Sequence, residues 1–76
     1  MLGLLLTTKE CQEVEYLLKR ELEEMLLDFG DKRIDHLVKR AMEERYATLF
    51  RMYARFASPR ELSKYVRKKS IKEESL

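Results

Sequence analysis

Few side chains of this sequence have the types and spacing needed for catalysis or metal binding. His36 is the sole histidine, and no acidic residue or second histidine lies one helical turn from it. A zinc site needs three or four such ligands, and a nucleophilic thiol needs a nearby base, which Cys11 lacks within its own helical segment. No glycine-rich phosphate loop is present. The sequence therefore predicts no enzyme, no metal site and no cofactor.

Arg45 is the first charged residue whose position suggests a specific role. Helical spacing places it among apolar residues that include Leu49 and Met52. If the chain folds as a hairpin about residues 30–31, Arg45 comes within reach of Glu15 or Glu21. One interpretation is an ion pair, within or between chains, that sets the register of the helices. The other is an anion-binding arginine, but a buried charge without a partner is costly, which favours the ion pair.

Large apolar side chains form a second candidate site. Tyr46, Phe50 and Tyr53 follow the i, i+4, i+7 spacing of one helical face, beside the main apolar stripe. Tyr16 and Leu27 project from the preceding helix, away from its apolar side. One hairpin cannot cover both sets, and exposed apolar area of this kind usually marks an interface. We expect these five residues to mediate self-association, unless a third helix folds back over them.

Basic side chains gather towards the C-terminal end and form a third candidate site. With nearby tyrosines they resemble the cationic and aromatic surface of a nucleic-acid-binding protein. They also suit a solvated face, and the acidic first helix would repel phosphate. The alternative nucleic-acid face consists of Arg51, Arg55, Arg60, Lys64, Arg67 and Lys68.

Two long helices, over residues 8–29 and 32–57, must position these side chains. The first has apolar residues at Cys11, Val14, Leu18, Leu22, Met25 and Phe29, in steps of three and four. Between the helices, Gly30 can adopt positive φ and end the first one, and Asp31 can cap the second. So short a connection predicts an antiparallel pair.

Capping signals set the outer limits of this all-α fold. Thr7 and Glu10 fit a capping box at the start of the first helix. The leading leucines would then fold against the first turn of that helix. Ser58, Pro59 and Glu61 fit a second one, which predicts a short third helix from residue 59 to about residue 68. Residues 1–68 are then one domain, and residues 69–76 are a frayed tail.

Composition and charge are consistent with this architecture. The chain has 76 residues, 45% hydrophobic and 39% charged, with a formal net charge of +2 that is too small to imply a nucleic-acid or membrane partner. A lone cysteine and the lack of a long apolar run predict a cytoplasmic protein. Residues 8–29 carry seven acidic and three basic side chains, and residues 31–57 carry seven basic and four acidic ones. An acidic helix therefore pairs favourably with a basic one, within a hairpin or between copies.

Three segments, residues 21–26 (ELEEML), 32–35 (KRID) and 43–46 (EERY), carry a resemblance. The chain resembles small uncharacterised helical proteins of Bacillus-type bacteria, which implies a bacterial cytoplasmic setting and no particular activity. We expect a hairpin with a short third helix, paired into a four-helix bundle as a homodimer. The predicted function is a protein-interaction module, and the alternative is a small nucleic-acid-associated protein.

Overall fold

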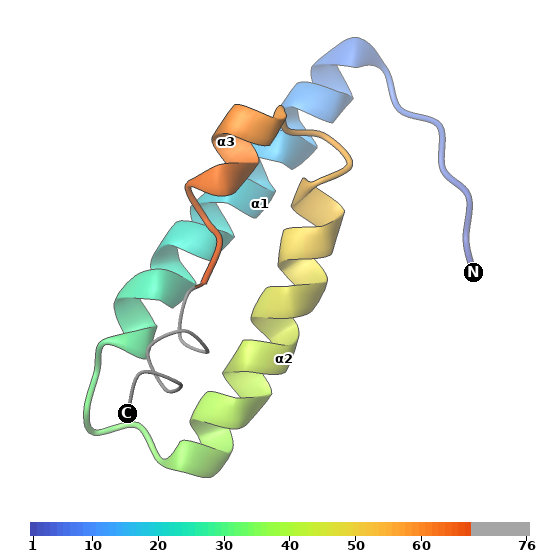
Figure 1. The fold of residues 1–76 in the computed structure, drawn as a ribbon. Coiled ribbons are helices and arrows are strands. Elements are labelled where there is room, and N and C mark those ends of the chain that lie inside the picture. Colours follow the sequence, from blue (N-terminus) through green and yellow to red (C-terminus); the bar gives the residue numbers. More distant parts are fainter. Residues whose placement is uncertain (68–76) are drawn as a thin grey trace.

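The computed structural model describes residues 1–67, and within them every regular element is a helix. Helix α1 spans Thr8–Phe29, α2 spans His36–Tyr53 and α3 spans Pro59–Ser63. Figure 1 shows α1 and α2 side by side as a hairpin, with α3 folded back beside the N-terminal half of α1. The predicted all-α hairpin with a short third helix is confirmed. The expected frayed tail, residues 69–76, and Lys68 lie outside the described residues.

The first helix has the predicted bounds because its N-terminus is capped as expected. The Thr7 hydroxyl accepts a hydrogen bond from the Glu10 amide at 3.1 Å. The Glu10 carboxylate accepts one from the Thr7 amide at 2.9 Å, which completes the capping box. Two amides that have no partner within the helix are thereby satisfied, so α1 begins at a defined residue.

The connection after α1 differs from the prediction. Gly30 has φ −80° and ψ −7°, so it is not in the left-handed conformation that was expected of it. Asp31 does not cap the second helix, because α2 begins only at His36; its carboxylate instead accepts hydrogen bonds from the Arg33 backbone amide and guanidinium. These bonds also hold the pKa of Asp31 below its usual value. Asp35 caps α2 instead, accepting from the Leu37 amide at 3.3 Å.

The second and third helices are both shorter than predicted. Helix α2 ends at Tyr53 rather than Ala57, in a turn where the Phe56 and Ala57 amides both donate to the Tyr53 carbonyl. Ser58 then caps α3 as predicted, accepting from the Glu61 amide at 3.2 Å. Helix α3 ends at Ser63, so residues 64–67 continue beside the hairpin as turn and coil.

The core lies where α1, α2 and residues 59–67 meet. Its buried members are Leu18, Leu22, Met25, Phe29, Tyr46, Tyr53 and Tyr65. From α2 the packed stripe is Met42, Tyr46, Leu49 and Tyr53, whereas the sequence suggested a stripe centred on Arg45. Helix α2 is therefore rotated by about one residue, roughly 100°, from the expected orientation. No helix within residues 1–67 combines the length and apolar character that a membrane crossing requires.

Candidate functional site

Two of the residues expected to mediate self-association are part of the protomer's own core. Tyr53 is fully buried and Tyr46 nearly so. The prediction that they form an exposed face for self-association is therefore wrong. The physical reason is the turn after α2, which brings Tyr65 against Tyr53 in an edge-to-face contact with ring centroids 5.5 Å apart. Tyr46 packs edge-on against Phe29 at 5.8 Å. Residues 59–67 thus cover Tyr46 and Tyr53, as the alternative interpretation proposed, but the covering Tyr65 lies in the turn after α3 rather than in a helix.

Polar contacts fasten residues 59–67, called the C-terminal cover below, to the hairpin. The Tyr46 hydroxyl donates to the Tyr65 carbonyl at 2.6 Å, and the Tyr65 hydroxyl donates to Glu23 at 2.7 Å. Burial raises the pKa of all three tyrosines of the core. The Arg67 guanidinium lies 3.7 Å from the centre of the Phe29 ring and forms an ion pair with Glu43. Sequence periodicity missed these contacts because the cover is too short to show a helical repeat.

Two of these buried tyrosines provide a matched test of the core. Among residues 1–67 the buried Tyr53 hydroxyl has no hydrogen-bond partner, whereas the Tyr46 hydroxyl donates to a backbone carbonyl. An unsatisfied buried polar group costs roughly 1–3 kcal/mol, and a satisfied bond contributes about 1 kcal/mol. We expect Tyr53→Phe to raise the free energy of unfolding and Tyr46→Phe to lower it, as measured by urea denaturation. The same sign for both variants would contradict this assignment.

Arg45 forms one of the predicted ion pairs but lies at the surface. Its guanidinium is 2.8 Å from the Glu21 carboxylate of the same chain and 3.5 Å from the Met25 sulfur. Glu15, the other predicted partner, is half-buried elsewhere on α1. The Arg45 side chain is 57% exposed, so its predicted burial in an apolar stripe is wrong. An exposed pair of this kind contributes only about 0–1 kcal/mol, and it marks the edge where α1 and α2 meet.

That edge belongs to the side of the hairpin opposite the C-terminal cover. Glu23, Glu43 and the Phe29 ring contact the cover, whereas Glu21 and Arg45 lie on the other edges of their helices. Half-exposed apolar side chains flank the Glu21–Arg45 pair. We call this surface the open face, and it consists of Leu17, Glu21, Val38, Ala41, Arg45 and Met52.

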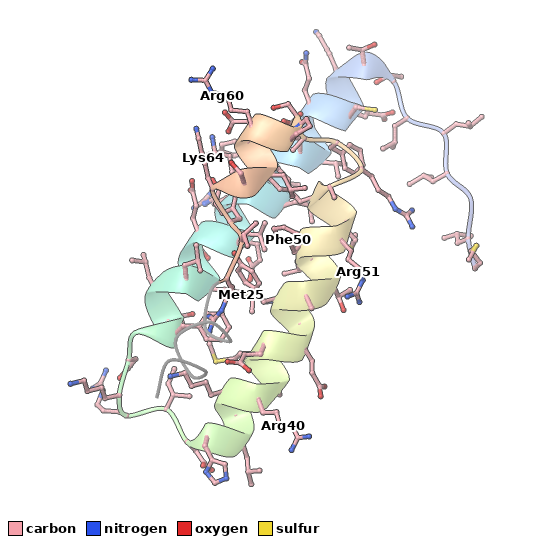
Figure 2. The ribbon with its side chains drawn as sticks, viewed as in Figure 1. Met25, Arg40, Phe50, Arg51, Arg60 and Lys64 are labelled. Carbon is pink, nitrogen blue, oxygen red and sulfur yellow. The ribbon has the colours of Figure 1, made fainter. Side chains whose placement is uncertain are left out.

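The remaining residues of the predicted self-association site do not form one surface. Tyr16 and Leu27 are exposed on the outer side of α1, where Arg20 and Glu23 lie between them along the helix. Phe50 points into the space between α2 and the cover, as Figure 2 shows. It lines a groove of about 400 Å³ there with neighbours that include Val66. The structure therefore separates Phe50 from the two residues of α1.

The predicted basic face is also divided. Arg60 and Lys64 project from the α3 side of the molecule, whereas Arg51 projects from the far side of α2 (Figure 2), although it lines the same groove as Arg67. Lys64 forms an ion pair with Glu61, and Arg67 is occupied with the core contacts described above. Arg55 is exposed at the end of α2 nearest the N-terminal segment.

His36 and Cys11 are not brought together. His36 is exposed beside Asp35 at the start of α2, and Cys11 is a half-buried free thiol in the first turns of α1. Residues 1–67 contain no group of three or more histidine, cysteine, aspartate or glutamate side chains arranged to hold a metal ion. Comparisons with protein-family models, curated proteins and solved structures found no match, so no relative assigns a role to these residues.

Proposed function

We propose that this protein is a non-enzymatic interaction module that self-associates through its open face. The observation that carries the proposal is the one-sided covering of the hairpin. The C-terminal cover packs on one side, and on the other side Leu17, Val38 and Met52 stay 53%, 52% and 43% exposed. Two packed helices leave apolar area on both sides, and a second hairpin on the open side makes a four-helix bundle. The cytoplasm remains the proposed location.

Charge supports a second copy as the partner. Helix α1 has seven acidic and three basic residues, whereas α2 has four basic and two acidic ones. When two hairpins stack by their open faces, placing α1 of one over α2 of the other brings opposite net charges together. Apolar burial at about 25 cal/mol per Å² supplies the affinity, and charge selects the arrangement.

Sedimentation of the wild-type protein and two charge-introducing variants tests the proposal. At high protein concentration the wild type is expected to sediment at twice the chain mass of 9.2 kDa. Met52→Glu places a charge within the proposed contact and is expected to return the mass to one chain. Leu27→Glu is the matched control, because Leu27 is 79% exposed on the outer side of α1 and should leave the pair intact.

Other outcomes would redirect or end this proposal. A wild-type mass of one chain at every concentration would contradict self-association. A loss of pairing in Leu27→Glu but not in Met52→Glu would contradict the open face as the contact surface.

A further inference from the structure

The seven residues before α1 are the most exposed apolar segment of the described chain. They run as an extended arm away from the helix end, as Figure 1 shows, rather than folding onto the first turn as the sequence suggested. Leu2 is 90% exposed and Leu5 is 97% exposed. The arm contains no charged side chain, and the Thr7 cap fixes the point at which it leaves α1. Apart from Leu6, which is half-buried, it is an apolar segment with a fixed origin and little cover.

A groove of about 330 Å³ lies between this arm and the end of the hairpin. Its walls are apolar apart from one guanidinium, and they are formed by Leu2, Leu4, Leu6, Val14, Met52, Arg55 and Phe56. Met52 belongs to both the groove and the open face, so the two surfaces are continuous. An occupant that suits this groove must be mostly apolar and uncharged.

The charge of the helices decides which end of a second copy lies beside this groove. Two hairpins can stack by their open faces about a two-fold axis that is either parallel or perpendicular to the helices. The perpendicular axis places α1 over α1, which brings together two helices that each carry four net negative charges. The parallel axis places α1 over the oppositely charged α2 and brings both arms to the same end of the bundle.

We infer that the arm of each copy packs into the groove of the other, so that the partner's leucines cover Met52 and Phe56. This inference rests on the proposed self-association and names the segment that completes it. The open face alone offers three large, half-exposed apolar side chains, whereas a stable interface uses about 20–30 residues a side. Exchange of the arms adds Met1, Leu2, Leu4 and Leu5, all exposed in the protomer, to the same interface.

Disulfide trapping between differently substituted chains tests this exchange. In a Cys11→Ser background, full-length Leu4→Cys and Met52→Cys proteins are mixed, oxidised and analysed by mass spectrometry. The expected main product is the mixed disulfide of one chain of each kind. Leu4→Cys mixed with Leu27→Cys is the matched control and should give little mixed product, because Leu27 lies near the far end of α1.

The outcomes separate failure of the arm exchange from failure of self-association. If the wild type sediments as two chains but no mixed disulfide forms, the exchange is wrong and the open-face pair survives. If a doubly substituted chain closes its own disulfide while the mixture does not cross-link, the arm belongs to its own groove. If the wild-type protein sediments at the mass of one chain at every concentration, both self-association and the arm exchange are wrong.

Discussion

Leu22→Ala is expected to lower the free energy of unfolding by about 2–5 kcal/mol, because it removes buried methyl groups and leaves a cavity. Leu22 is 0% exposed and lies in the middle of the α1 stripe. A core in a chain of this size rarely supplies more than about 3–5 kcal/mol, so the variant should be largely unfolded at room temperature. Urea denaturation followed by circular dichroism measures the loss.

Leu27→Ala is the matched control for this substitution. It changes the same residue type in the same helix, but at a position that is 79% exposed. Substitutions at such surface sites usually change stability by no more than about 0.5 kcal/mol. Similar losses in the two variants would mean that the packed face of α1 has been assigned wrongly.

The second large effect is expected at Tyr65, the main apolar anchor of the C-terminal cover. Tyr65→Ala should cost about 3–5 kcal/mol, the range for removing a buried aromatic side chain. Tyr65 is 5% exposed and packs edge-on against Tyr53, so its loss also uncovers the aromatic strip of α2. Urea denaturation gives the stability, and binding of an apolar fluorescent dye reports the apolar surface that the substitution uncovers.

Tyr65→Phe separates the ring from its hydroxyl. This variant keeps the contact with Tyr53 and loses only the hydrogen bond to Glu23, which is worth about 1.5–3 kcal/mol because its acceptor is charged. The dye should therefore bind Tyr65→Ala much more than Tyr65→Phe. An unchanged stability in Tyr65→Ala would show that residues 59–67 do not cover the hairpin in solution.

Local signals were sufficient to predict α1 but not α2. The bounds of the first helix follow from a capping box whose two partners are three residues apart, so they depend on contacts within one turn. The second helix has apolar residues on several sides. A stripe through Ala41 and Met52 and a stripe through Tyr46 and Tyr53 both satisfy helical spacing. Periodicity alone could not choose between them.

The packing of the C-terminal cover determines which of the two stripes of α2 is buried. Tyr46 and Tyr53 are buried because the Tyr65 backbone and ring reach them from beyond the turn at residues 54–58. These contacts join residues that are 12 and 19 positions apart, and no local pattern reports them. As a consequence Arg45 lies on the open face, where it forms an ion pair with Glu21.

The sequence by itself determined the helical class of the fold, the hairpin, the bounds of α1 and the caps at Thr7 and Ser58, because these follow from spacing and from hydrogen bonds between near neighbours. Tertiary structure alone decided the start and rotation of α2, the burial of the aromatic strip and the exposure of the open face and the arm. The physical reason is that burial depends on which distant segment arrives to exclude water, and helical periodicity does not encode that partner.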